Sequence, residues 1–344
     1  MERSFDGRSI DQLEHDLAQP TEELVDAMRR LQGDLMVLGA AGKMGPSLCR
    51  LASRASEAAD TPRAIWAVSR FTDDTVRQSL ETAGVRTVQA DLLEDDALAG
   101  LPESPNVVLM AGHKFGSSSQ PELAWATNVL LPALAAHRYA SSRIVAFSTG
   151  NVYPLTPVVL GGSTEDDPVA PVGEYAVTAL GRERVLTYQA SARSTPMCLL
   201  RLNYAVEPRY GVLRDLADKV KANQPIDVTM GHVNVIWQRD ANAIALRALA
   251  HCGVPPQVLN VTGGETISVR QVAEAFGGMF DVEPVFEGRE STEALLSNAS
   301  RCRELFGAPT VGLDEMMERV GRWVGDGGPG LGKPTHYQER GGKF

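Results

Sequence analysis

The glycine-rich stretch VLGAAGKMG, residues 37–45, constrains the fold of this chain more than any other feature. It begins within the apolar run LMVL, residues 35–38, and leads into PSLCRLASRAS, whose apolar residues have helical spacing. Gly39, Gly42 and Gly45 permit a tight strand-to-helix turn and let the backbone approach a pyrophosphate, whose charge is favoured at a helix N-terminus. The turn therefore predicts a dinucleotide-binding loop, which Lys43 and Met44 complete.

Short, continuously apolar runs alternate with helical segments as far as residue 203. The runs are LMVLG (35–39), AIWAVS (64–69), VRTVQADL (85–92), NVVLMAG (106–112), RIVAFST (143–149) and MCLLRLN (197–203). Buried strands joined by helices form a parallel sheet, and such connections are right-handed. We therefore expect an α/β fold, namely a doubly wound Rossmann-type parallel sheet with a smaller C-terminal α/β substrate lobe.

The points where this rhythm breaks predict the domain organisation. The start of the chain has helical spacing and a TEEL capping box, whereas its end is glycine-rich and polar, so that it is either mobile or an arm laid on another surface. The expected parts are a helical N-terminal extension (1–33), a dinucleotide-binding Rossmann domain (34–204 and 233–262), a substrate-binding lobe (205–232 and 263–325) and a flexible tail (326–344).

Composition narrows the class of protein. The net charge of −10 disfavours nucleic acid and anionic membranes as partners. No window approaches 18 uncharged apolar residues, and the first residues are polar, which predicts neither a secretory signal nor a membrane span. The four cysteines form no CxxC pair and the six histidines no HxxxH or HxH spacing. We expect a soluble cytoplasmic protein without a metal site.

Several motifs in chain order carry a family resemblance. They are GxxGxxG (39–45), ADL (90–92), LMAGHKFG (109–116), FSTGNVYP (147–154), VLNVTGGETISVRQVAEA (258–275) and SNASRCRELFG (297–307). From about residue 34 to 325 the chain thereby resembles the extended short-chain dehydrogenase/reductase family, of the NAD-dependent epimerase/dehydratase type. The resemblance implies an NAD(P)-dependent oxidoreductase or epimerase that acts on a hydroxyl or keto group of a carbohydrate-like small molecule.

The choice between the two nicotinamide cofactors is predicted from the end of the second strand. An acid there would bind a free ribose 2′-hydroxyl, but this chain has Ser69 and Arg70, which suit a 2′-phosphate, with Lys43 as a second nearby cation. We therefore expect NADP in preference to NAD. The resemblance adds further cofactor-binding positions, which are Asp91, Leu92, Ala111, Gly112, Asn128 and Ser148.

The catalytic positions follow from the resemblance as well. In the family, a tyrosine moves a proton to or from the substrate oxygen, a lysine four residues later supports it, and a serine or threonine orients the carbonyl. Tyr175 and Thr149 match the first and last, but GEYAVTALG (173–181) has Ala179 at the lysine position. An unassisted phenol is a poor base and a sufficient acid, so carbonyl reduction tolerates this loss better than alcohol oxidation. We expect Lys114 to supply the missing charge and Arg182, seven residues after Tyr175, to be solvated.

The substrate is less constrained. Many relatives that use sugar nucleotides have an arginine where this chain has Val233, and an asparagine where it has Tyr204. We therefore expect a smaller sugar or sugar acid as substrate, bound by Asn151, Asn203, Tyr204 and Trp237.

Two other functions stay open: a nucleotide-sugar epimerase or dehydratase, and a catalytically impaired NAD(P)-binding sensor or scaffold, which the missing lysine favours. As in family members, a homodimer formed by helices 121–140 and 173–193 is expected.

Overall fold

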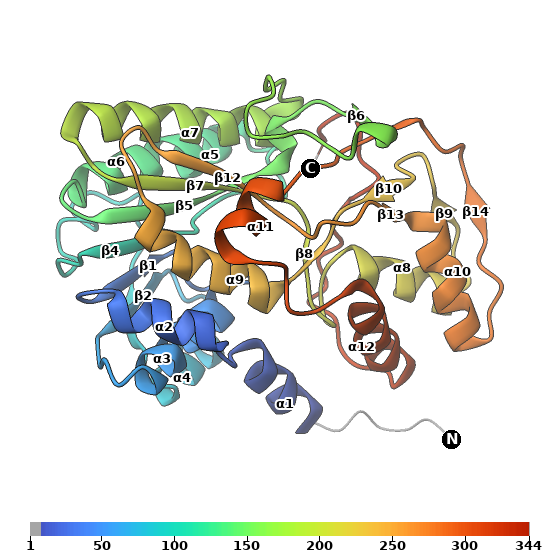
Figure 1. Ribbon diagram of the computed structural model, residues 1–344, viewed down its shortest axis with the longest axis horizontal. Coiled ribbons are helices and arrows are strands. Elements are labelled where there is room, and N and C mark those ends of the chain that lie inside the picture. The colour runs from blue at the N-terminus through green and yellow to red at the C-terminus, as the bar shows by residue number, and fades with distance from the viewer. Residues whose placement is uncertain (1–7, 344) are drawn as a thin grey trace.

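A seven-stranded parallel sheet lies at the centre of the protein (Figure 1). The computed structural model describes residues 8–343, so residues 1–7 of the expected helical extension and residue 344 of the expected tail lie outside the described residues. The strand order is β12-β7-β5-β4-β1-β2-β3, and every neighbouring pair is parallel. The strands are β1 (Leu35–Leu38), β2 (Ile65–Ser69), β3 (Arg86–Gln89), β4 (Asn106–Leu109), β5 (Arg143–Thr149), β7 (Met197–Leu202) and β12 (Gln257–Val261). The expected doubly wound α/β fold is confirmed.

Helices cover both faces of the sheet, because its central strands are apolar on each side. One face is packed by α2 (Glu22–Arg30), α3 (Gly45–Ala58), α4 (Asp74–Thr82) and α9 (Gln238–Arg247). The other is packed by α6 (Leu131–Arg138) and α7 (Gly173–Arg193), with α5 (Pro121–Trp125) beside them. Figure 1 shows the two layers above and below the strands.

The C-terminal lobe has a separate apolar core, centred on Trp237, Phe276 and Val320. Three helices pack around it: α8 (Val212–Lys221), α10 (Val269–Phe280) and α12 (Leu313–Gly325). Short strand pairs complete the lobe and its junction with the sheet, namely β6 (Thr156–Pro157) with β15 (Glu293–Ala294), β8 (Ala205–Val206) with β11 (Ile236–Trp237), β9 (Ile226–Asp227) with β14 (Phe286–Glu287), and β10 (His232–Val233) with β13 (Ile267–Ser268). The helix α11 (Ser300–Phe306) contacts β12.

The N-terminal helices join the two cores. Leu13 and Leu17 of α1 (Arg8–Leu17) are buried in the core of the lobe, whereas Leu24 and Met28 of α2 are buried against the sheet layer. Thr21 caps α2 by accepting a hydrogen bond from the backbone N–H of Leu24, as the TEEL pattern predicts.

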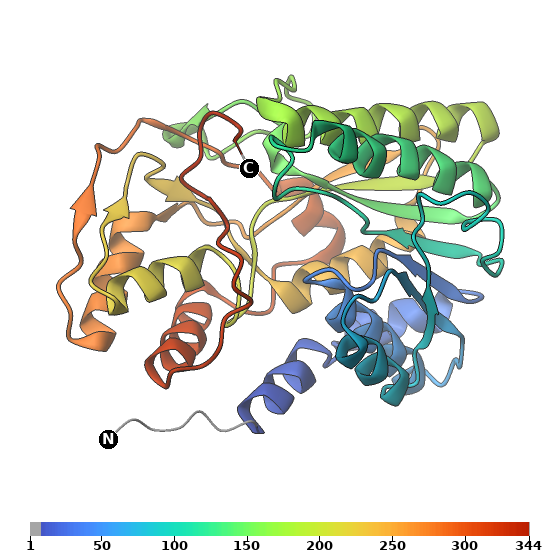
Figure 2. The ribbon, with the colours of Figure 1, turned by 180° about the vertical axis from the view of Figure 1, so that it is seen from behind.

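The segment after α12 is laid along the protein as an arm. Residues 329–343, here called the C-terminal arm, include the buried residues Thr335 and Tyr337 (Figure 2). The Tyr337 hydroxyl donates to the carbonyl of Asp227 at 3.4 Å. The end of the chain was expected to be either mobile or an arm laid on another surface. In the structure, this part of the expected tail is an arm laid on the rest of the protein.

The expected helix 121–140 contains an irregularity. Between α5 and α6, residues Ala126–Leu130 form a π-helical turn. Pro132 has no N–H to donate to the carbonyl of Asn128, so this carbonyl is available to another donor. The site below uses it.

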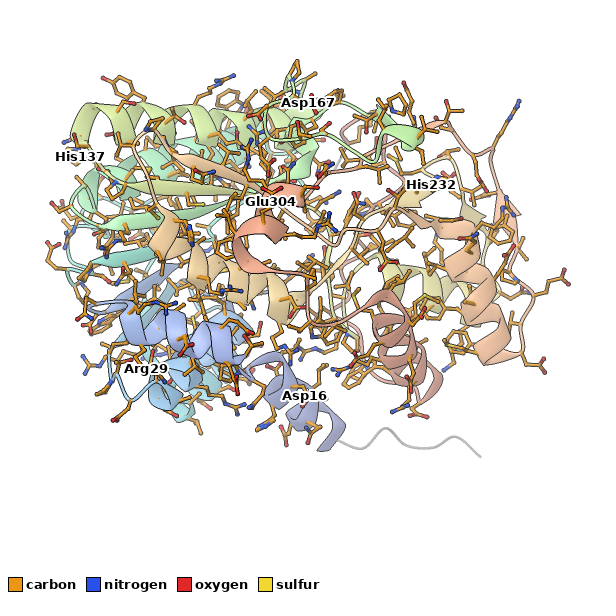
Figure 3. All side chains as sticks on the ribbon, viewed as in Figure 1. Asp16, Arg29, His137, Asp167, His232 and Glu304 are labelled. Atoms are coloured by element: carbon orange, nitrogen blue, oxygen red, sulfur yellow. The ribbon has the colours of Figure 1, made fainter. Side chains whose placement is uncertain are left out.

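Polar side chains such as those of Arg29, His137 and Asp167 are exposed on the outside of the protein (Figure 3). Over residues 8–343, no helix combines the length and apolar character needed to cross a lipid bilayer.

Candidate active site

A cavity of about 730 Å³ lies between the carboxyl ends of the strands and the C-terminal lobe. This is where open parallel sheets bind ligands. Many of the residues predicted from the sequence line this central cavity: Gly39, Gly42, Lys43, Met44, Gly45, Gly112, Lys114, Ser148, Thr149, Asn151, Tyr175, Asn203 and Tyr204.

The glycine loop fits a pyrophosphate. Gly39 has a φ of +88°, and a Cβ there would lie 2.5 Å from the backbone nitrogen of Ala111. A Cβ on Gly45 would lie 2.2 Å from the carbonyl oxygen of Ala40, so both positions require glycine for packing. Gly42 differs, because a Cβ there would meet only the Gly39 carbonyl at 3.5 Å. Its exposed backbone faces open space at the start of α3, where a phosphate group is electrostatically favoured.

Tyr175 and Thr149 form the pair that was expected to handle the proton. Tyr175 is in the first turn of α7, and Thr149 is the last residue of β5. Burial raises the pKa of Tyr175, while its hydrogen bond with Thr149 and the charge of Arg182 lower it. The Thr149 hydroxyl also accepts hydrogen bonds from Asn151, at 3.2 Å from the backbone nitrogen and 3.0 Å from Nδ2. The two hydroxyls are therefore held together at the cavity wall.

Arg182 is not solvated, contrary to the expectation. It is 6% exposed, and its guanidinium points into the protein beside the central cavity. Its Nη1 donates to the Phe147 carbonyl at 2.5 Å, Nε to the Asn128 carbonyl at 3.2 Å and Nη2 to Asn128 Oδ1 at 2.8 Å. The expectation was wrong because the π-helical turn and Pro132 leave a backbone acceptor that holds the side chain inward.

Asn128 therefore has a positioning role instead of lining the cavity. It also accepts from the backbone N–H of His113 at 2.8 Å and donates to the His113 carbonyl at 2.9 Å. It donates as well to the hydroxyl of Thr178 at 2.9 Å. These bonds tie the segment that contains Gly112 to α7.

Two lysines lie over aromatic rings on the lobe side of the cavity. Lys114 Nζ is 5.6 Å from the ring centroid of Tyr175 and donates to the Thr335 carbonyl at 3.3 Å. Lys43 Nζ is 4.1 Å from the ring centroid of Phe115 and 3.5 Å from that of Tyr210. Burial lowers the pKa of Lys43 to about 7 and that of Lys114 to about 8. Lys43 and Arg70 were both expected near a ribose 2′-phosphate, but only Lys43 lines the cavity, whereas Arg70 is exposed outside its lining.

Several other predicted site residues also lie outside the cavity lining, namely Ser69, Asp91, Leu92, Ala111 and Trp237. Leu92 is buried in the core under the sheet, and Asp91 accepts from the backbone N–H of Leu93 at 3.1 Å. Trp237 corrects the substrate-pocket prediction: it is fully buried in the core of the lobe, where Arg319 lies over its ring at 5.2 Å. An indole of that size in an apolar strand pair is stabilised by packing.

A buried polar network supports the catalytic pair from below. Ser148 donates to Glu183 at 2.6 Å, and Arg201 forms an ion pair with Glu183 at 2.7 Å. Arg201 also donates to the hydroxyl of Tyr153 at 2.7 Å, which donates to Asn260 at 2.9 Å. Sequence reasoning missed this network, because its members are scattered over four segments and have no shared motif. The network fixes the end of β5 against α7, and so the distance between Thr149 and Tyr175.

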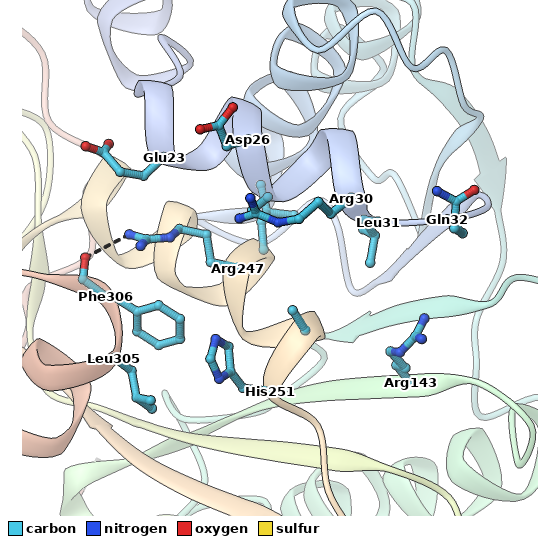
Figure 4. A pocket seen from close by; sticks show the side chains of 13 residues that line it. Glu23, Asp26, Arg30, Leu31, Gln32, Arg143, Arg247, His251, Leu305 and Phe306 are labelled. Carbon is cyan, nitrogen blue, oxygen red and sulfur yellow. Dashed lines mark hydrogen bonds between the residues drawn. The ribbon is translucent and has the colours of Figure 1, made fainter.

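A second cavity of about 470 Å³ lies away from this chemistry (Figure 4). It is bordered by α2, α9 and α11, and Arg247 donates to the Phe306 carbonyl there at 2.9 Å. The residues described above as catalytic or cofactor-binding candidates do not line it.

Comparisons with known proteins agree with this geometry. A sequence profile of the NAD dependent epimerase/dehydratase family matches residues 35–262, whereas no curated protein matches the chain. The structure is similar to UDP-glucuronic acid 4-epimerase from Bacillus cereus, in complex with UDP-4-deoxy-4-fluoro-glucuronic acid and NAD, with a TM-score of 0.73 and 18% identity over 85% of this chain and 98% of that chain. It is also similar to UDP-glucose 4-epimerase from Thermotoga maritima with UDP-glucose, with a TM-score of 0.68 and 16% identity over 85% and 98% of the two chains. These likenesses show a shared fold over the matched 85% of this chain.

Proposed function

Because the chain belongs to the NAD-dependent epimerase/dehydratase family, we propose that it is an oxidoreductase or epimerase that acts on a hydroxyl or keto group of a carbohydrate-like small molecule. The observation that carries the proposal is the hydrogen-bonded pair of Tyr175 and Thr149, which lies in the same cavity as the glycine loop. A phenol and a hydroxyl at one wall can hold a single substrate oxygen between them.

The cofactor supplies the hydride donor or acceptor when it is bound. The open backbone at Gly42 and the start of α3 would hold its pyrophosphate, and Gly112 and Ser148 line the cavity farther along. For the ribose 2′ position we propose a preference for NADP, supported by the exposed Arg70 and by Ser69 in place of an acid at the end of β2. Titration with both cofactors tests this choice, and tighter binding of NAD would overturn it.

Tyr175 moves the proton, and Arg182 supports it in place of the missing lysine. Ala179, four residues after Tyr175, is buried and has no charge to offer. Arg182 comes one turn later on the same helix, and its charge lowers the pKa of Tyr175. A nearby cation favours the phenolate, which is the form needed to take a proton from an alcohol. We therefore assign Arg182 as a positioning residue that acts through Tyr175.

A small sugar or sugar acid is the proposed substrate class, with a nucleotide sugar as the second candidate. The two solved epimerases contain UDP-linked sugars, which supports the second. Arg209 lines the cavity, but its guanidinium is already bound by Glu14 at 2.5 Å and Glu207 at 3.0 Å. Val233 is buried in the lobe, so this position offers no charge to a diphosphate. Both observations support the smaller substrate.

The proposal is tested by offering sugars, sugar acids and nucleotide sugars to the purified protein with either cofactor. Nicotinamide absorbance reports oxidation or reduction, and proton NMR reports epimerisation. Tyr175→Phe should lower turnover by about 10²-fold or more and leave cofactor binding intact. Tyr188→Phe is the matched control, because Tyr188 lies on the same helix and is 70% exposed. Cofactor binding without conversion of any compound, in wild type and Tyr175→Phe alike, would instead identify a sensor or scaffold.

We also propose that the protein is a homodimer. Leu123, Trp125, Leu130 and Leu134 on α5, the π-helical turn and α6 are exposed large apolar side chains, as is Val177 on α7, which packs against that turn and α6. A second copy of this chain would cover them. Light scattering should give a dimer mass for the wild type and a monomer mass for Leu130→Glu; a monomeric wild type would refute the dimer.

A further inference from the structure

The C-terminal arm runs from the end of α12 along the side of the protein that Figure 2 faces, and residues of the arm line the central cavity. The backbone N–H of Leu331 donates to the Arg209 carbonyl at 3.0 Å, and Thr335 donates to Asp215 from its backbone N–H at 2.7 Å and its hydroxyl at 2.6 Å. Farther along, the His336 ring is 6.0 Å from the ring of Phe115. The arm is thus anchored at each side of the cavity, and Leu331, Lys333 and Thr335 form part of the cavity wall.

The arm adds a third lysine to a pair that already faces the reacting centre. Lys114 bonds the arm at Thr335 and lies over the ring of Tyr175. Lys43 shares the ring of Phe115 with Lys114, at 4.1 Å and 5.5 Å from the ring centroid. The positive charges of Lys114 and Lys333 both act on Lys43 and, after burial, contribute to the lowered pKa of its ammonium. Lys43 is therefore repelled by two other lysines that line the same cavity.

The carboxylates among the described residues that line the cavity are already engaged by other side chains. Glu14 and Asp73 are the acids among the described residues that line the cavity. Glu14 is bound by Arg50 and Arg209, and Asp73 by Thr75. Asp215 raises the pKa of both Lys43 and Lys114 and so favours their charged forms. Its carboxylate accepts a hydrogen bond from the backbone N–H of Thr335. In a chain with a net charge of −10, this is a local excess of positive charge.

We propose that Lys43, Lys114 and Lys333 form an anion site, here called the lysine site, which binds a carboxylate or phosphate group of the substrate while the C-terminal arm closes over it. An oxyanion there would relieve the repulsion among the ammoniums and gain charge-assisted hydrogen bonds. Because Lys114 is beside Tyr175, a sugar anchored by its anionic group would present a hydroxyl or keto group to Tyr175 and Thr149. This inference rests on the proposed function and deepens it, since it defines the substrate as an anionic sugar derivative.

The test is calorimetric titration of the full chain saturated with NADPH, or with NADH if that cofactor binds more tightly, so that the cofactor's own phosphates are already bound. The probes are glucose, glucuronate and glucose 6-phosphate. We expect at least one of the two anions to bind about tenfold more tightly than glucose, and the stronger of them identifies the preferred group. Anions that bind no more tightly than glucose, or do not bind, overturn the proposal.

Variants of the arm make the assignment specific. Lys333→Ala should weaken binding of the preferred anion by about threefold to tenfold, and Lys333→Arg should restore most of it. Lys343→Ala is the matched control, because Lys343 is exposed on the same arm and does not line the cavity. Equal anion affinity in wild type and Lys333→Ala refutes the role of the arm.

Failure of the anion site and failure of the proposed function are distinguishable. Tyr175→Phe should lose turnover and still bind the anion in calorimetry. If anions bind no better than neutral sugars, while neutral sugars are turned over in a Tyr175-dependent way, the proposed function stands and the lysine site is refuted. If anions bind preferentially but Tyr175→Phe leaves turnover unchanged, the lysine site stands and the proposed catalytic function is refuted.

Discussion

Arg182 follows Tyr175 by seven residues on α7, and its buried guanidinium is held by the carbonyls of Phe147 and Asn128 so that its charge acts on the Tyr175 phenol. The helix thus places a cation two turns from the phenol, whereas the position one turn away is occupied by Ala179. Burial lowers the pKa of the Arg182 guanidinium, while Tyr175 and Glu183 raise it. Because arginine has a much higher ordinary pKa than lysine, it keeps its charge more readily in a buried position.

The first prediction concerns Arg182. Arg182→Ala removes a charge that favours the phenolate, so the pKa of Tyr175 rises and the acidic limb of alcohol oxidation, on which the rate increases with pH, moves to higher pH. Oxidation at neutral pH should slow by about tenfold to a hundredfold, and carbonyl reduction should slow less. Arg182→Lys should recover part of the pH profile, because it keeps the charge. The measurement is kcat against pH in both directions.

Arg184→Ala is the control for this series, since Arg184 is an exposed arginine on the same helix. If Arg182→Ala and Arg184→Ala have the same pH profile, Arg182 has only a structural role.

The second prediction concerns the ion pair beneath the catalytic residues. Arg201 and Glu183 have side-chain exposures of 8% and 6%, so Arg201→Ala leaves a buried carboxylate without its cation. We expect a loss of about 3–5 kcal/mol in the free energy of unfolding, measured by urea denaturation. Glu103→Gln, which breaks the pair with Arg138 at an exposed carboxylate, should cost less than about 1 kcal/mol. Similar losses in the two variants would contradict a supporting role for the buried network.

The third prediction separates two glycines of the loop. Gly42→Ala places its Cβ in open space and should preserve the melting temperature, but it fills the position where the pyrophosphate would contact the backbone. Cofactor affinity should fall by about tenfold or more. Gly45→Ala meets the Ala40 carbonyl at 2.2 Å and should lower the melting temperature itself. Unchanged NADH affinity in Gly42→Ala, measured by nicotinamide fluorescence, would place the pyrophosphate elsewhere.

The fourth prediction is the pH dependence of anion binding. Burial, together with the charges of Lys114 and Lys333, lowers the pKa of Lys43 to about 7, and burial lowers that of Lys114 to about 8, while Asp215 opposes both shifts. Both ammoniums are charged below these values and lose their protons as pH rises through them. Glucuronate, whose carboxylate is ionised throughout this range, should therefore bind more weakly as pH rises through about 7 and about 8. The bound anion favours the charged ammoniums, which moves the loss to somewhat higher pH in the complex. Affinity that is constant over this range would show that neither lysine contributes charge to binding.

Sequence reasoning was sufficient for the sheet and for the Tyr175–Thr149 pair, because strand periodicity, the glycine turn and the motif spacing are local features. It was insufficient for Arg182, whose position depends on an acceptor created on another helix. The signal was present in the sequence, since Pro132 follows Asn128 by four residues and so frees the carbonyl of Asn128. Which side chain would reach that carbonyl depended on how α6 and α7 pack.

The environment of Trp237, and the choice between a mobile tail and an arm, could not be decided from the sequence for a related reason. A tryptophan near polar residues and a glycine-rich polar segment have local compositions that fit a pocket and a mobile tail. Their true environments arise from the lobe core and from Asp215 and Asp227, which are about a hundred or more residues away from the arm in the chain. Only long-range packing decides such cases.

The contact between the arm and α7 is made by two glycines. Gly173 has a φ of +82°, and a Cβ there would lie 2.1 Å from the Gly342 carbonyl oxygen; a Cβ on Gly342 would lie 2.1 Å from the Val172 carbonyl oxygen. Neither glycine lines the cavity, although Tyr175 is only two residues beyond Gly173. A single methyl group at Gly342 therefore offers a way to lift the end of the arm without altering any side chain that meets a ligand. The rates of substrate and product release could then be compared between the wild type and Gly342→Ala, with the side chains of the site unchanged.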